Sequence, residues 1–162
     1  MQKLISTAEA IAKLLRERHE TVAVAESSTG GLVSAALLAV PGASDYFLGG
    51  AIVYTLEARR VLLAIPDSDV RGIRASTEPY VQLGARTIRE RLGATWGVAE
   101  SGATGPTGNR YGDAPGHTAI AVSGPIERSA TIETGSADRI ANMDEFAMVV
   151  LKMLRDALES NR

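Results

Sequence analysis

Short apolar segments alternate with longer segments of helical periodicity along the whole chain, and this alternation limits the folds that the sequence can adopt. Residues 1–20 place apolar side chains at three- and four-residue spacing, which predicts a helix with one buried face. That face consists of Leu4, Ala8, Ile11, Ala12 and Leu15. The segment TVAVAE (21–26) is short, apolar and β-branched, as in a buried strand. Helices interleaved with such strands favour a three-layer α/β/α sandwich with a mixed sheet.

The remaining elements continue this alternation. The glycine pair at 49–50 indicates a β-bulge or a close backbone approach within a strand. In order, we expect a helix over 30–40, one longer or two short strands within 44–55, a helix over 56–65, a helix over 76–93, a strand over 94–101, paired strands at 117–124 and 127–135, and a helix from Ile140 to Leu158. The inner face of the 76–93 helix is predicted to carry Tyr80, Leu83, Gly84, Thr87 and Ile88. We expect one domain over 1–162.

Composition and charge argue against several classes of function. The chain has no cysteine, which removes disulfides, thiolate nucleophiles and cysteine-based zinc sites. A net charge of -2 gives no electrostatic basis for nucleic acid as a partner. No run of about 18 apolar residues is present to cross a membrane, and the charged N-terminal segment is typical of an amphipathic helix, not of a signal peptide. We expect a cytoplasmic protein without a metal site, because no spacing of its acidic residues requires one.

The segment ESSTGG (26–31) joins the first predicted strand to an apolar helix, and it has two interpretations. In one, Ser28 or Thr29 caps the helix, which is the ordinary use of a hydroxyl at this position. In the other, Ser27 or Ser28 supplies a nucleophile. The unpaired N–H groups of the helix start would then receive a phosphate or a developing oxyanion, and the glycines would let it approach. The segment is neither a G-x-S-x-G elbow nor a Walker A loop.

A second unusual loop, SGATGPTGNRYGD (101–113), follows another predicted strand and holds four glycines. Long loops in compact domains are often functional, although a flexible surface hairpin has the same composition. Ligands in open α/β sheets bind beyond the carboxyl ends of strands. Two such loops after two apolar strands therefore favour a binding site at that edge.

These residues together resemble the C-terminal amidase domain of the CinA (competence/damage-inducible) proteins, which also occurs alone as PncC. The family pattern reads approximately A-E-S-C-T-G-G, then P-G-[SA]-S, then G-x-x-x-Y-[ST]-N-E-A-K. It is similar to AESSTGG (25–31), PGAS (41–44) and GAIVYTLEAR (50–59). Further on, SGATGPTG (101–108) resembles [ST]-G-I-A-G-P-x-G, and GSADR (135–139) resembles S-G-D-R. The order and spacing match across nearly the whole chain.

The resemblance implies a three-layer α/β enzyme that hydrolyses the amide of nicotinamide mononucleotide to nicotinic acid mononucleotide and ammonia, without a metal or organic cofactor. It implies Ser27 as the nucleophile, Tyr54 beside it, and Arg59 at the position of a lysine thought to activate the serine. Arg139 would hold the substrate phosphate. The other residues that the match assigns to the substrate-binding loops are Ser28, Thr29, Gly30, Gly31, Ser101, Gly102, Thr104 and Gly105.

Several departures from the family pattern bear on the activity. Ser28 replaces a cysteine, Leu56 replaces an asparagine, and Arg59 replaces the lysine. An arginine keeps its proton and cannot act as a base as a desolvated lysine can. The second loop also differs, because NRYGDAPGHT (109–118) stands in place of a segment that ends in P-V-G-T.

Three alternatives stay open at this point. In the first, the amidase retains its activity with another base, namely Tyr54, Glu57 or a water-linked carboxylate, while Arg59 stabilises the oxyanion. In the second, the fold is a catalytically silent nucleotide-binding module. In the third, it hydrolyses a different, more anionic amide or ester that suits Arg59 and Arg110. Fold analogy also favours a homodimer, formed through the first helix and the YFLGG segment (46–50).

Overall fold

A five-stranded mixed sheet forms the centre of the protein, which the computed structural model describes over residues 1–161. The strand order is β2-β1-β3-β4-β5, in which β2, β1 and β3 run parallel, β4 is antiparallel to β3, and β5 is antiparallel to β4. The strands are β1 (Val22–Glu26), β2 (Phe47–Ile52), β3 (Trp96–Ala103), β4 (His117–Ser123) and β5 (Arg128–Glu133). The predicted mixed sheet is thus confirmed, including the β4–β5 hairpin.

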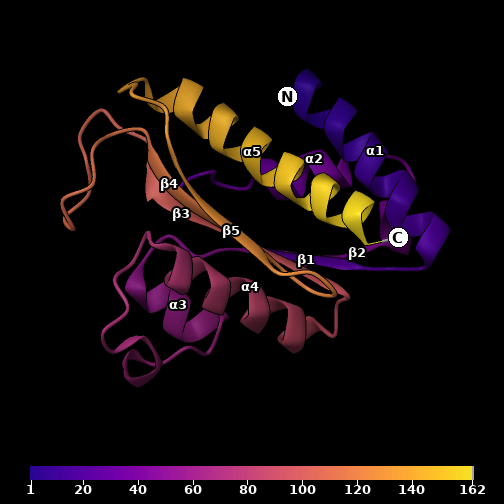
Figure 1. Cartoon of the computed structure of the whole chain (residues 1–162), viewed down its shortest axis with the longest axis horizontal. Coiled ribbons are helices and arrows are strands. Elements are labelled where there is room, and N and C mark those ends of the chain that lie inside the picture. Colours follow the sequence, from indigo (N-terminus) through magenta and orange to yellow (C-terminus); the bar gives the residue numbers. More distant parts are fainter. Residues whose placement is uncertain (162) are drawn as a thin grey trace.

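Helices cover both faces of the sheet and complete the three layers (Figure 1). One face carries α1 (Gln2–Arg18), α2 (Leu32–Leu38) and α5 (Arg139–Ser160), and the other carries α3 (Leu56–Leu62) and α4 (Glu78–Leu92). Two short 3-10 turns, Ala43–Asp45 and Asp67–Val70, lie in the connections. The five residues predicted for the inner face of α1 are all buried, because they pack against α2 and α5.

Close packing between α4 and β3 depends on glycine. A Cβ added at Gly97 of β3 would lie 2.0 Å from the backbone oxygen of Ala85, so the helix could not sit as near to the sheet. The predicted inner face of α4 is confirmed in part, because Gly84 and Ile88 are buried while Leu83 and Thr87 are half-buried. The buried residues of α4 are Val81, Gly84, Ala85 and Ile88, whereas Tyr80 is only half-buried.

The glycine pair of β2 serves both of the purposes considered for it. The pairing of β1 with β2 skips Leu48, since Val22 pairs with Phe47 and Ala23 with Gly49, which is a β-bulge. A Cβ at Gly50 would lie 2.3 Å from the Ser34 hydroxyl of α2. The strand therefore bulges just before Gly49, and α2 covers it closely at Gly50.

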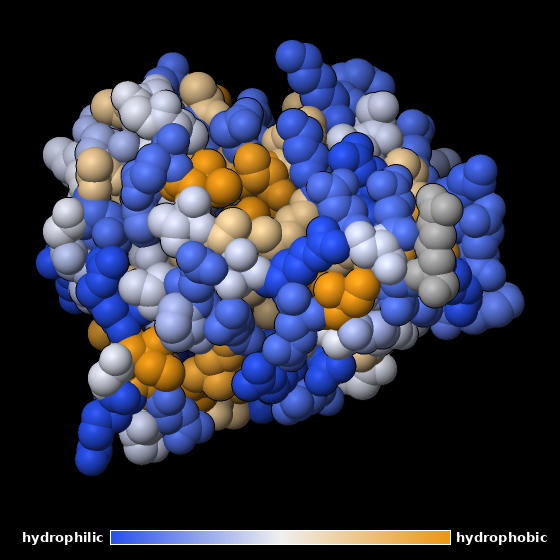
Figure 2. All heavy atoms as spheres, viewed as in Figure 1, coloured by the Kyte–Doolittle hydropathy of each residue, from blue (hydrophilic) through white to orange (hydrophobic). Residues whose placement is uncertain are grey.

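The surface is mainly hydrophilic, with apolar side chains gathered in a few places (Figure 2). One of these places lies over α3, where Val61 and Leu62 are exposed. None of the helices within residues 1–161 combines the length and the apolar character that crossing a membrane requires.

Candidate functional site

A cleft opens where the parallel strands β1, β2 and β3 end, at the edge of the sheet where ligands of α/β proteins bind. The cleft is a hollow of about 330 Å³, lined by residues that include Ser27, Tyr54, Tyr80 and Ser101. A deeper pocket beneath it shares Ser27, Tyr80 and Ser101, and it adds Arg59 and Glu100. A side pocket of about 210 Å³ is lined by Tyr54 and Gly102 of the cleft together with Ser28, Thr104, Gly105 and Arg139.

The turn that carries Ser27 is held from below by the buried carboxylate of Glu100 on β3. The backbone N–H groups of Ser27 and Thr29 donate to its Oε2 atom at 3.0 and 3.1 Å. Its Oε1 atom accepts from the Ser28 hydroxyl, and from the Thr118 hydroxyl at 3.1 Å. Burial raises the pKa of Glu100, and hydrogen bonds from Ser28, Thr29, Ser27 and Thr118 oppose part of the rise.

The cap of α2 is supplied by a different residue from the two that the sequence favoured. Glu26 accepts from the backbone N–H groups of Val33 and Ser34 at 3.1 and 3.0 Å, so its carboxylate satisfies the helix N-terminus. The prediction that Ser28 or Thr29 caps this helix is therefore wrong. The physical reason is that the N-cap position falls on Gly31, two residues later than expected.

Three of the residues that the family match assigned to the substrate do not line the cleft or either adjoining pocket. Thr29 is fully buried, and its hydroxyl donates to Glu26 at 2.7 Å. Gly30 and Gly31 adopt positive φ angles of 64° and 102°, which glycine tolerates and other residues rarely adopt. These three residues build the turn, whereas the Ser27 side chain faces the cleft. The Ser27 hydroxyl has no hydrogen-bond partner within residues 1–161.

The second loop and the start of α5 form the side pocket. The Arg139 guanidinium donates to the Gly105 carbonyl at 2.6 Å, and its Nη2 atom lies 3.5 Å from the Tyr54 hydroxyl. A Cβ at Gly105 would lie 2.5 Å from the Ala137 backbone oxygen, so the loop passes directly beneath the entry to α5. Arg139, Tyr54, Thr104 and Gly105 are thus brought together from three distant segments.

Arg59 is buried, with 4% of its surface exposed, and its guanidinium is bound by neighbouring residues of the same segment. Its Nε atom donates to the Ile65 carbonyl at 3.2 Å, and its Nη2 atom pairs with the Asp67 carboxylate. Burial raises the pKa of the Tyr80 hydroxyl, and the adjacent Arg59 guanidinium opposes that rise. Arg59 therefore forms the floor of the deep pocket and also anchors the segment after α3.

Sequence reasoning missed Glu100, although the sequence contains a signal for it. The tripeptide Ala-Glu-Ser occurs twice, at 25–27 and at 99–101, where the first copy closes β1 and the second lies within the neighbouring parallel strand β3. Ala25 and Ala99 are paired in the sheet, so the two glutamates lie at equivalent heights and share the Thr29 hydroxyl, at 2.7 and 3.2 Å. Each tripeptide also delivers a serine to the cleft, since Ser101 lies beside Ser27 in its lining.

Ser76 was also missed. Its hydroxyl lies 3.1 Å from that of Ser101, on a backbone with a positive φ angle of 57°. Such a conformation is uncommon outside glycine, and no sequence pattern marks it. Within residues 1–161, no group of three or more histidine, aspartate or glutamate side chains is arranged to hold a metal ion.

Taken together, the fold and the cleft define a three-layer α/β protein with a serine-lined site at the carboxyl ends of three parallel strands. A family model described as the CinA C-terminal domain matches residues 4–158. The chain belongs to this family.

Related proteins agree with this assignment. A CinA-like protein of Prochlorococcus marinus (strain MIT 9313) is 47% identical over 120 residues, which make up 74% of this chain and 28% of that protein. A CinA-like protein of Salinibacter ruber (strain DSM 13855 / M31) is 35% identical over 144 residues, or 89% of this chain and 35% of that protein. The chain spans about a third of the length of these curated relatives.

Solved structures share the architecture. The competence or damage-inducible protein from Enterobacter asburiae superposes with a TM-score of 0.89 at 26% identity, covering 96% of this chain and 98% of that one. The competence damage-inducible protein A from Klebsiella pneumoniae subsp. pneumoniae MGH 78578 superposes with a TM-score of 0.91 at 24% identity, covering 98% and 99%. The α/β fold with a mixed sheet is therefore that of the CinA superfamily.

Proposed function

We propose that this chain is a serine amidohydrolase that converts nicotinamide mononucleotide to nicotinic acid mononucleotide and ammonia. The observation that carries the proposal is the position of Ser27, which lines both the cleft and the deep pocket on a turn fixed by Glu100. Arg139 in the side pocket supplies a cation for the substrate phosphate, and the cleft volume lies in the range of small-molecule sites. The substrate itself comes from the family resemblance.

In the proposed reaction, the Ser27 oxygen bonds to the carboxamide carbon and the serine proton passes to a base. The tetrahedral intermediate then breaks its carbon–nitrogen bond, and the nitrogen leaves as ammonia after taking a proton. Water cleaves the resulting acyl-serine to give the acid. The Ser28 N–H is suited to the oxyanion, because its neighbours at 27 and 29 donate to Glu100 whereas it donates to no acceptor within the described chain.

Glu100 is the carboxylate best placed to serve as the base through a bridging water. It lines the same deep pocket as Ser27, and burial raises its pKa. Both of its oxygens already accept hydrogen bonds from the Ser27 turn and Thr118, so the serine proton would reach it by way of that water. Glu57, one of the alternatives from the sequence, instead forms an exposed pair with Arg60 at 3.2 Å and does not line the cleft. Tyr54, another alternative, is 61% exposed with its hydroxyl near Arg139.

Ammonia release from nicotinamide mononucleotide tests the proposal directly. Wild-type protein should release ammonia in step with the acid product, and Ser27→Ala should lose at least about a thousandfold in kcat, as expected when a nucleophile is removed. Ser6→Ala, which changes an exposed serine on α1 away from the cleft, serves as the matched control. Circular dichroism and urea denaturation establish that the variants are folded.

A binding module without catalysis is the second candidate, and one observation favours it. Arg59 holds the place of the family lysine, and its guanidinium is paired with Asp67 and Ile65 instead of being available to take a proton. In that case calorimetry would detect the nucleotide on wild-type protein while no ammonia forms over long incubation. Substantial turnover that disappears in Ser27→Ala would exclude this alternative.

A further inference from the structure

Flat aromatic rings are concentrated at the cleft. The chain has four tyrosines, and three of them, Tyr54, Tyr80 and Tyr111, line this one hollow. They come from the segment after β2, from α4 and from the loop between β3 and β4. The fourth, Tyr46, is fully buried in the core. In a chain with 4% aromatic residues, this clustering indicates that the cleft receives a planar group.

Tyr111 is held in place although it lies on a long loop. The Asn109 side-chain oxygen accepts from the backbone N–H groups of Tyr111 and Asp113, at 3.0 and 3.1 Å. The Asp113 carboxylate in turn accepts from the Asn109 amide at 2.8 Å and from the Arg74 guanidinium at 2.7 Å. Arg74 also reaches the Tyr111 carbonyl at 3.5 Å. The loop is therefore tied to the segment before α4, and Tyr111 is positioned by this network.

The hydroxyl groups of the other two tyrosines already lie beside arginines, so their rings remain as the surface for a ligand. The Tyr54 hydroxyl lies 3.5 Å from Arg139, and Tyr80 contacts Arg59. Tyr54 is 61% exposed and Tyr111 is 37% exposed. Exposure of this extent is unusual for a large aromatic side chain. Arg110, exposed next to Tyr111, adds positive charge to the same lining.

We propose that Tyr111 is a specificity-determining residue, which stacks on the planar heteroaromatic ring of the ligand while Arg110 of the cleft and Arg139 of the side pocket hold its anionic end. The inference rests on the proposed function for the choice of a nucleotide, but it concerns a residue in the segment where the chain departs from its family pattern. An aromatic side chain can stack on different bases, because every base has a flat face. The interaction requires a ring on the protein and a ring on the ligand. Loss of the ring should therefore weaken binding of any ligand with a flat base and leave a ligand without one unaffected.

Calorimetry on the Ser27→Ala protein, in which turnover cannot deplete the ligand, tests this inference. The probes are nicotinamide mononucleotide, adenosine monophosphate and ribose 5-phosphate, the last having a phosphate but no ring. We expect Tyr111→Leu to weaken binding of nicotinamide mononucleotide about tenfold, the size of effect seen when a stacking ring is removed, and ribose 5-phosphate by less than about twofold. Tyr111→Phe, which keeps the ring, should restore most of the affinity. Val61→Ala, an exposed change on α3, is the control.

The possible results separate this inference from the proposed function. Equal nucleotide affinity for wild-type Tyr111 and Tyr111→Leu would overturn the stacking role while leaving the amidase intact. Binding of adenosine monophosphate that depends on Tyr111, without binding or turnover of nicotinamide mononucleotide, would uphold the stacking role and overturn the amidase. If neither nucleotide binds, the stacking role is overturned, and the ammonia assay reports on the amidase independently.

Discussion

Arg59 is a charged side chain in a buried place, and its surroundings explain how the fold tolerates it. A buried charge is costly unless it is paired and hydrogen-bonded. The Ile65 carbonyl, the Asp67 carboxylate and the Tyr80 hydroxyl provide those partners. The same three contacts tie the segment after α3 to the wall of the deep pocket. A residue that the sequence presented as a lost catalytic base is therefore also a structural anchor.

Arg59 and its neighbour Arg60 form a natural matched pair, because both guanidinium groups bind the same carboxylate of Asp67. We expect Arg59→Ala to lower the free energy of unfolding by about 2–4 kcal/mol, since it leaves the Ile65 carbonyl and the pocket floor without partners. Arg60→Ala should lower it much less, because the Arg60 side chain is exposed and solvent screens its pair with Asp67. Urea denaturation measures both, and similar losses in the two variants would contradict the anchoring role.

At the scale of residues, the sequence predicted the members of the site better than their roles. Ser27, Tyr54, Ser101 and Arg139 all line the cleft or its side pocket, and the motif order was enough to find them. The cap of α2 was wrong, because the sequence cannot reveal that a buried glutamate reaches seven residues ahead to Val33. Buried carboxylates such as Glu26 and Glu100 break the usual rule of apolar interiors, so pattern reasoning has no place for them.

At the scale of elements, the loop over 104–116 is the part of the site whose position depends on charge. His117 begins β4 at the end of this loop and lies opposite Glu133 in the β4–β5 pairing. Its two ring nitrogens contact the Glu133 carboxylate and the Ser76 carbonyl, the latter at 2.8 Å. Asp113 lies 3.6 Å from the same ring. Both ring nitrogens face acceptors, so the protonated imidazolium satisfies the site best.

A pH dependence of stability follows from His117. Burial alone would lower the pKa of His117, but the Ser76 carbonyl, Glu133 and Asp113 outweigh it and raise that pKa above its usual value of about 6.5. The group therefore contributes stability that is fully present below about pH 6.5, and that is lost as the pH rises through the raised folded-state pKa. We expect the free energy of unfolding of the wild type to exceed that of His117→Asn by about 1–3 kcal/mol at pH 5.5, and by less at pH 9.

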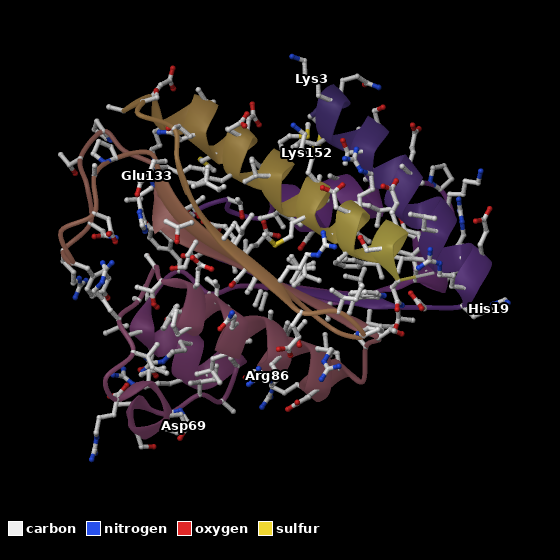
Figure 3. The ribbon with its side chains drawn as sticks, in the orientation of Figure 1. Lys3, His19, Asp69, Arg86, Glu133 and Lys152 are labelled. Atoms are coloured by element: carbon white, nitrogen blue, oxygen red, sulfur yellow. The ribbon has the colours of Figure 1, made fainter. Side chains whose placement is uncertain are left out.

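The second histidine of the chain supplies the control for this measurement. His19 is exposed at the end of α1, far from Glu133 (Figure 3), and its backbone adopts a left-handed conformation that asparagine tolerates. His19→Asn should keep the wild-type pH dependence. A stability difference between the wild type and His117→Asn that stays constant from pH 5.5 to pH 9 would show that the proton on His117 does not hold this loop.

Elements with a regular apolar spacing were predicted well from the sequence. Elements whose bounds or buried face depend on long-range contacts were predicted less well. The buried face of α1 is the predicted one, because its apolar spacing leaves a single choice. The helix expected over 30–40 begins only at Leu32. Gly30 and Gly31 take left-handed backbone angles and belong to the turn that is hydrogen-bonded to Glu100. The buried face of α4 includes Val81 and Ala85 beside the predicted Gly84 and Ile88, where Gly97 lets the helix backbone approach the sheet closely. Such long-range contacts leave no local signal.

At the scale of the whole molecule, the two ends of the sheet differ in how they meet solvent. The β2 end has no charged residue within Phe47–Ile52, and Leu48 and Ile52 are exposed there. Edge strands of soluble proteins usually carry a charge, a proline or a cover that blocks pairing with another chain. The apolar face of α1, in contrast, is buried within the chain and is not available as a dimer surface.

We accordingly expect self-association through the β2 edge. Leu48→Lys places a charge on that edge and should shift light-scattering molar masses from dimer toward monomer at micromolar concentration. Leu62→Lys makes the same change at a similarly exposed leucine on α3 and should leave the molar mass as in the wild type. A wild-type protein that is monomeric throughout the concentration series would contradict the expectation.

The bond between the Ser27 turn and Glu100 has a consequence for how the molecule opens. Amide hydrogens in a turn usually exchange with solvent deuterium within seconds, yet those of Ser27 and Thr29 point at a carboxylate buried on the central strand β3. Releasing them breaks bonds to a side chain anchored on the central strand, so it costs more than the fraying of a turn that faces water. These two amides should therefore keep their hydrogens well beyond the lifetime that is usual for a turn.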